Sequence, residues 1–252
     1  MTTYLERYLA GERERVWAEL LALGARVRDE PVYSDALAVA RETMRRARHN
    51  IEVLIPRLEE IGYYFGYGWL ENDERSFANW QPPVFGPPKP HVLDRIIELE
   101  TLIGPLPLSL RAWYETVGAV NFVGAAPEQW HVDERADPLY IYPIEEALAE
   151  YAEWKTVHTA WAAGDEANDP GPFRVPIAPD FCHKYNISGG MWYHIVLPNP
   201  AMDAPLQAER HAVTFVKYLR ICFHWGGLPG LDIAPVVPAP ELASLTRDLL
   251  PL

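Results

Sequence analysis

The chain has 252 residues, of which 49% are hydrophobic and 23% are charged, and these ordinary values for a globular protein exclude wholesale disorder. Its formal net charge of −13 disfavours nucleic-acid binding, because phosphate backbones repel such a chain, and favours a basic partner. No stretch reaches the ~20 apolar residues of a membrane-spanning helix, and no apolar run follows a basic start. We therefore expect a cytoplasmic protein with no membrane contact.

The first 62 residues predict a helical arm. A first helical region runs from residue 2 to about residue 24, and a longer helix follows Ser34, its predicted N-cap, and ends at Gly62. Pro56 should kink it, and the basic run over residues 41–50 should form a solvated face. We favour packing of its apolar stripe against the first helices as a hairpin. Packing against a second subunit is the alternative, so both a monomer and a homodimer remain open. The stripe comprises Leu37, Ala40, Met44, Ala47, Ile51, Leu54, Leu58 and Ile61.

A connector rich in Gly, Pro and aromatic residues covers residues 62–90 and is the best candidate for a domain boundary. It separates an arm over residues 1–90 from a domain over residues 91–252. Because the connector is too aromatic for a free linker, we expect four of its side chains to pin it to a folded surface: Tyr64, Phe65, Trp69 and Trp80.

From residue 91 the chain changes to short elements. Helices are predicted over residues 92–102, 106–118, 208–224 and 240–250, and a long helix begins at Pro143 and carries an inward stripe as far as Trp161. Strands are predicted over residues 120–123, 139–142, 174–177 and 191–197. This order favours an α+β fold, with a mainly antiparallel sheet packed by helices and preceded by the helical hairpin arm.

Several of these segments together resemble the SUKH superfamily. The run Glu98–Gly104, the step Leu106-Pro107 and the run Leu110–Gly124 look like the opening of that domain, with Ala119 where the family has a second Gly. Residues 177–180 and 188–198 look like its strand region, and residues 214–220 look like its closing helix. The resemblance covers about residues 93–231.

This resemblance implies protein binding rather than a reaction. Many bacterial SUKH proteins are thought to be immunity proteins that neutralise toxins, and a fungal member regulates cell-wall synthesis through protein partners. The resemblance thus implies that this chain is a non-catalytic protein-binding module whose partner is another protein, a bacterial toxin being one such partner.

Catalytic and metal-binding motifs are absent from the sequence. It contains no GxSxG, HExxH, P-loop or GxGxxG pattern. The pattern around His131 and Asp133 fits a solvated acidic loop better than a metal site. The scattered Cys and His residues lack the short, fixed spacings of a zinc site. We therefore expect no enzyme activity, no metal, no cofactor, and two reduced thiols at Cys182 and Cys222.

Aromatic residues beside the predicted strands are the better functional lead. Strand alternation places Trp192 and Tyr193 on opposite faces. One face should pack against helices, whereas the other would present an aromatic anchor with acidic neighbours to a partner. The candidate partner-binding residues are Trp130, Asp137, Tyr140, Asp180 and Trp192. The alternative is a small-molecule-binding protein or enzyme with a pocket between the arm and the α+β domain.

Overall fold

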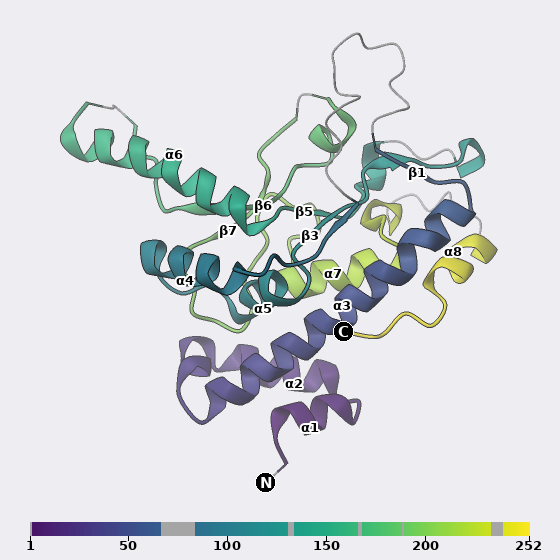
Figure 1. The fold of residues 1–252 in the computed structure, drawn as a ribbon, viewed down its shortest axis with the longest axis horizontal. Coiled ribbons are helices and arrows are strands. Elements are labelled where there is room, and N and C mark those ends of the chain that lie inside the picture. Colours follow the sequence, from purple (N-terminus) through teal and green to yellow (C-terminus); the bar gives the residue numbers. More distant parts are fainter. Residues whose placement is uncertain (1, 67–83, 131–133, 166–167, 188, 233–238) are drawn as a thin grey trace.

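The computed structural model describes residues 2–66, 84–130, 134–165, 168–187, 189–232 and 239–252 (Figure 1). These residues form helices and short antiparallel sheets, which confirms the predicted α+β class. The α-helices are α1 (Tyr4–Leu9), α2 (Arg13–Ala22), α3 (Val32–Glu60), α4 (Val92–Ile103), α5 (Leu108–Thr116), α6 (Ile144–Ala163), α7 (Phe215–His224) and α8 (Ala239–Thr246).

The strands are short and pair antiparallel in three small sheets. They are β1 (Tyr64–Phe65), β2 (Phe85–Gly86), β3 (Ala119–Asn121), β4 (Gly124–Ala125), β5 (Tyr140–Ile141), β6 (Arg174–Ala178) and β7 (Tyr193–Val196). The strand orders are β1-β4, β2-β3-β5 and β6-β7. The backbone N–H of Tyr142 donates to the carbonyl of Ile177 at 2.8 Å, so the second and third sheets join edge to edge.

Helix α3 begins at Val32, two residues before the predicted N-cap Ser34, and its observed N-cap is Pro31. Ser34 lies inside the first turn, where its hydroxyl donates to Glu30 at 2.8 Å. The helix continues through Pro56 to Glu60. The basic run is largely paired, for example between Arg41 and Glu115 at 2.6 Å, so its charges are neutralised within the chain.

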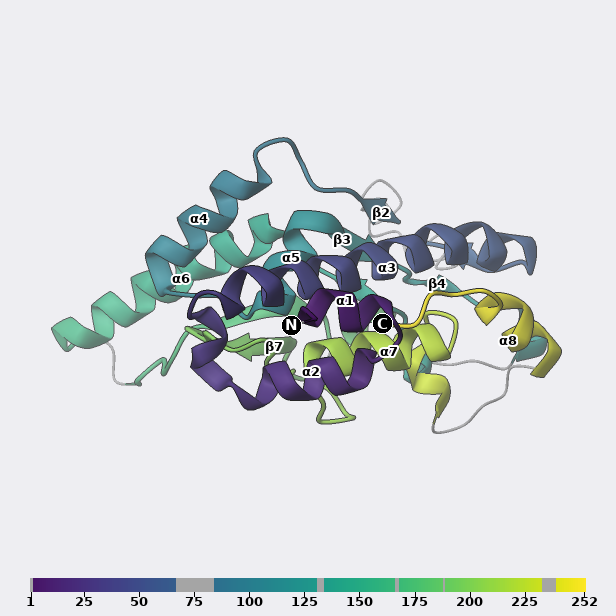
Figure 2. The same cartoon turned by 90° about the horizontal axis from the view of Figure 1, so that it is seen from below.

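The apolar stripe of α3 packs against other parts of the same chain. Its members from Leu37 to Leu58 are buried, and the helix packs most extensively against α5. The predicted hairpin partner was therefore only partly right: α1 also packs on α3, and Trp17 of α2 donates its indole N–H to the Thr43 hydroxyl at 3.2 Å. Figure 2 shows α3 lying along the body with α1 and α2 on one side of it.

One hydrophobic core crosses the predicted boundary at residue 90. It includes Tyr8, Leu54, Trp113, Ile177 and Phe223, so both halves of the chain contribute to it. The connector is part of this body, because β1 and β2 pair with β4 and β3. Of the residues expected to pin it, Phe65 packs on the core, Tyr64 is 55% exposed, and Trp69 and Trp80 lie outside the described residues.

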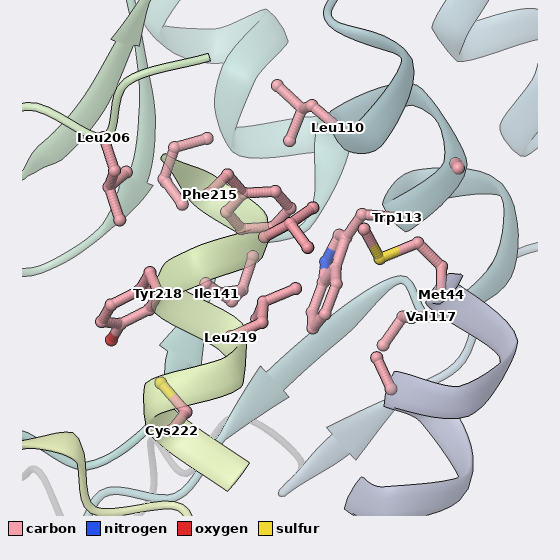
Figure 3. Packing of buried hydrophobic residues seen from close by; sticks show 14 of the residues in the cluster. Met44, Leu110, Trp113, Val117, Ile141, Leu206, Phe215, Tyr218, Leu219 and Cys222 are labelled. Atoms are coloured by element: carbon pink, nitrogen blue, oxygen red, sulfur yellow. The ribbon is translucent and has the colours of Figure 1, made fainter. Parts of the chain in front are cut away.

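Helix α7 begins at Phe215, seven residues later than predicted. Ala208 and Ala212 have φ of 63° and 52°, which a right-handed helix does not allow. The carboxylate of Asp203 accepts the backbone N–H of Val216 at 3.1 Å and so caps the observed start. From there α7 runs through the core, where the ring of Phe215 meets Trp113 of α5 at 5.5 Å, edge to face (Figure 3).

Helix α3 also holds the last described residues of the chain. The fully buried side chain of Asn50 accepts the backbone N–H of Leu250 at 2.7 Å and donates to its carbonyl at 2.9 Å. Arg46 donates to the carbonyl of Pro251 at 3.2 Å. Residues 200 positions apart are therefore joined by two side-chain-to-backbone hydrogen bonds, which satisfy both backbone groups of Leu250.

Candidate functional site

The predicted partner-binding residues do not form one surface. Trp130 is 1% exposed and Asp137 is fully buried, so both predictions of a partner contact are corrected: neither side chain reaches the surface. Trp130 packs as a core aromatic at the end of a short 3₁₀ helix over residues 128–130. The sequence gives the type of each residue but not how deeply its side chain is buried, so it could not distinguish a core aromatic from a surface anchor.

Asp137 belongs to a buried ion pair. Its Oδ1 lies 2.5 Å from the Nζ of Lys184, and both side chains are fully buried. The hydroxyl of Tyr193 donates to the other carboxylate oxygen at 3.1 Å, and the Lys184 ammonium lies 4.9 Å from the centre of the Tyr193 ring. Burial, and then the nearby Asp137 carboxylate, raise the pKa of Tyr193, which stays protonated and donating. This triad stabilises the interior.

Asp180 also has an internal role, since it is 5% exposed. It accepts the backbone N–H of Cys182 at 2.8 Å and of His183 at 3.2 Å, and it pairs with the His183 ring. Its side chain thus shapes the turn into a 3₁₀ helix over residues 183–185. Tyr140 is 8% exposed and packs against Tyr142, with ring centres 5.0 Å apart and ring planes at 58°; it also lines a cavity described below.

Trp192 is the predicted partner residue that lies at the surface. Its side chain is 38% exposed, whereas the adjacent Tyr193 is 1% exposed, which confirms that the two point to opposite faces. Met191, the preceding residue, and Ile187, five residues earlier, are 51% and 47% exposed. This segment before β7 therefore carries three partly exposed large apolar side chains.

Helix α6 carries a second exposed surface, one that the sequence did not predict. The stripe expected to face inward does so only in the first turns, where Ala147 is fully buried. The helix then extends away from the body (Figure 1), and Trp161 near its end is 36% exposed. An inward stripe needs a neighbouring element along its whole length, and within the described chain the packing of this stripe against the core extends as far as Trp154.

The aromatic side chains of α6 form a continuous row, here called the aromatic ladder: Tyr151, Trp154, His158 and Trp161. Successive ring centres lie 5.8, 4.7 and 5.6 Å apart. At its inner end the buried ring of Phe173 contacts Tyr151 and Trp154 at 5.5 and 5.7 Å, which fixes the row to the core.

An open groove of about 600 Å³ runs along the aromatic ladder. Its other wall includes Pro172, Pro198 and the exposed side chain of Leu102 at the end of α4. The indole N–H of Trp154 donates to the carbonyl of Gly171 at 3.1 Å, which orients that ring along the groove. The groove therefore combines aromatic and proline side chains with polar ones, among them Lys155 and Asp169, and it is partly pre-organised and open to solvent.

Three glutamates line the neighbouring face of α6, here called the acidic stripe: Glu146, Glu150 and Glu153. Their spacing of four and three residues places them on one side of the helix. None of them forms an ion pair with a described residue. Burial, and then the like charges of Glu153 and Glu146, raise the pKa of Glu150. The stripe is thus a concentration of uncompensated negative charge beside the aromatic ladder.

Side chains suited to metal binding are dispersed. Within the parts of the chain that the structure describes, no three His, Cys, Asp or Glu side chains converge as metal ligands would. His131 and Asp133 lie outside those parts. Cys182 and Cys222 form no disulfide within the described chain, and burial raises the pKa of Cys222 well above its ordinary value. His194 bonds Gln207 and the carbonyl of Trp192, as expected for a histidine within a sheet.

Comparison of the chain with protein-family models, with curated proteins and with solved structures found no match. The resemblance to the SUKH superfamily therefore stays a prediction. Across the described residues, no helix combines the length and the apolar character that crossing a bilayer requires.

Proposed function

We propose that this chain is a non-catalytic, cytoplasmic protein-binding module that binds a basic segment of another protein along α6. The observation that supports this most is the pairing of the partly exposed aromatic ladder with the acidic stripe on one projecting helix. A toxin neutralised by this chain is one partner of that kind.

The chemistry of the two rows specifies the partner. Exposed rings such as Trp161 bury apolar area and attract the cationic heads of Lys and Arg by cation–π contact. The acidic stripe attracts the same cations, and the net charge of −13 speeds their approach. An amphipathic segment with alternating Lys or Arg and Leu side chains would match both rows.

Capture from a lysate of the source organism tests the proposal, with Trp161→Ala as the main variant. We expect the wild type to retain a basic protein that high salt elutes, because exposed charge pairs are screened. Trp161→Ala should weaken the affinity about 30-fold, as loss of an aromatic anchor costs about 2 kcal/mol.

Thr156→Ala is the matched control, since Thr156 is exposed on another face of α6 and its hydroxyl bonds only its own helix backbone, at Ala152. It should retain the partner like the wild type. A captured protein that binds Trp161→Ala as tightly as the wild type, or that is acidic, would count against the proposal, as would the absence of any protein retained specifically.

A further inference from the structure

A cavity of about 480 Å³ lies where the connector crosses the start of α4, the end of α5 and the sheet β2-β3-β5. It is far more enclosed than the groove beside α6, and its volume falls in the range typical of small-molecule sites. Its wall is mainly apolar, with side chains that include Pro87, Val92, Val120, Pro143 and Ile144.

The backbone geometry of the connector builds this cavity. A Cβ on Gly118, whose φ is +86°, would lie 2.3 Å from the carbonyl oxygen of Gly86. Only glycine therefore lets the connector press against the turn between α5 and β3. Gly86 pairs with Ala119, so the strand β2 holds this side of the cavity in register. The cavity is thus bounded by hydrogen-bonded backbone on this side.

One polar group in the wall has no hydrogen-bond partner among the described residues. Tyr114 lines the cavity and is 1% exposed, yet its hydroxyl forms no hydrogen bond with any described residue. Burial, and then the Glu145 carboxylate, raise its pKa, so the hydroxyl keeps its proton and lies within electrostatic reach of Glu145 at the cavity's edge. Because the hydroxyl oxygen is accessible to solvent, it is available to an acceptor atom of a ligand.

The edge of the cavity is predominantly basic. Lys89, His91 and Arg95 line it, against the single carboxylate of Glu145. Lys89 pairs with Glu145 at 2.7 Å, and Arg95 pairs with Glu98, which is not part of the lining. Both cationic side chains are largely or partly exposed, at 73% and 43%, so they can reorient toward an incoming anion.

We infer that this cavity binds a small amphiphilic acid, with its apolar body against the Pro, Val and Ile wall and its anionic oxygens between the Tyr114 hydroxyl and the ammonium of Lys89. The phenol donates to the acid oxygen and Lys89 neutralises its charge, while Arg95 adds a second cation. This site is separate from the aromatic ladder, so it stands or falls independently of the proposed function.

Two fluorescent probes with the same rings test this inference: 1-anilinonaphthalene-8-sulfonate, which is anionic, and N-phenyl-1-naphthylamine, which is neutral. The wild-type chain should bind both and enhance their fluorescence, and the anionic probe should bind more tightly. Tyr114→Phe should weaken the anionic probe about tenfold, the value of one charge-assisted hydrogen bond, and the neutral probe much less. Lys89→Ala should act in the same direction.

A cavity-filling variant locates the bound probe. Ala119→Phe places a ring in the cavity and should abolish binding of both probes, whereas Ala18→Phe adds the same ring at an exposed position on α2 and should bind like the wild type. Thermal melts of all variants establish that they are folded. The inference is overturned if the wild type binds neither probe, if folded Ala119→Phe binds both unchanged, or if Tyr114→Phe affects the two probes equally. If Ala119→Phe does not fold, the difference between the probes in Tyr114→Phe alone decides.

Discussion

The interior triad around Asp137 and the surface of α6 use the same kinds of side chain at different depths. Each combines carboxylates with aromatic rings. In the triad the carboxylate is fully buried, and Lys184 and Tyr193 satisfy it completely. On α6 the glutamates are unpaired within the described chain and the rings become more exposed toward Trp161. Buried charge must be satisfied internally, whereas charge left unsatisfied at the surface is available to a partner.

The largest effect should follow from breaking the triad. Asp137→Ala leaves the Lys184 ammonium buried without its carboxylate, so the free energy of unfolding should fall by about 3–5 kcal/mol. Urea denaturation measures this loss. Glu153→Ala removes an exposed carboxylate and should change the same quantity by no more than about 0.5 kcal/mol. Equal effects from the two substitutions would remove the distinction between the regions.

The aromatic ladder should show a gradient of stability along α6. Trp154 is half-buried, touches Phe173 and donates to Gly171, so Trp154→Ala should cost about 2 kcal/mol. Trp161 is exposed, and Trp161→Ala should cost less than about 1 kcal/mol. Chemical denaturation of both variants measures the gradient, and a larger loss for Trp161 would mean that it packs against something in solution.

Trp192 tests whether an exposed aromatic side chain outside α6 also contacts the partner protein. We expect Trp192→Ala to keep a cooperative melt, with a loss of less than about 1 kcal/mol, because the side chain is 38% exposed. Partner affinity, measured by calorimetry with the captured protein, should fall if the segment before β7 contributes to binding. Tyr193→Ala is the buried neighbour, and its melt should shift to a much lower temperature. Loss of cooperative melting in Trp192→Ala would make it a core residue.

The smallest effect concerns the acidic stripe. Glu153→Gln removes one of the like charges that raise the pKa of Glu150, so that pKa should move down toward its ordinary value. When the pKa of a carboxyl is higher in the folded than in the unfolded chain, the free energy of unfolding falls as the pH rises through these two pKa values. Glu153→Gln should therefore melt slightly higher than the wild type at pH 7, and the difference should vanish below about pH 4. Carboxyl NMR titration measures the pKa, with Glu14→Gln as a remote control.

The fold class and most elements were predictable because their signals are local. Apolar periodicity and flanking Gly or Pro located α3, α4, α5 and β7 to within a few residues. The start of α7 was missed because it depends on Asp203, a distant residue that binds the backbone N–H of Val216. The boundary at residue 90 marked a change in composition, while the core runs through it.

The candidate site was harder to predict because depth is a tertiary property. Nothing near Asp137 in the sequence indicates that Lys184 arrives beside it. The inward stripe of α6 was predicted along its whole length, because periodicity cannot tell where a neighbouring element ends. The spacing of Glu146, Glu150 and Glu153 was a usable signal, since three like charges on one helix face predict a surface that seeks cations.

The bond between Asn50 and Leu250 makes a segment without helix or strand into a reporter on α3. The Leu250 amide is held by a fully buried side chain of that helix, at 2.7 Å. Its hydrogen can exchange with deuterated water only when the bond to Asn50 opens, which requires the end segment to detach or α3 to unfold. The exchange rate of this one amide would therefore measure how often the end segment detaches from α3.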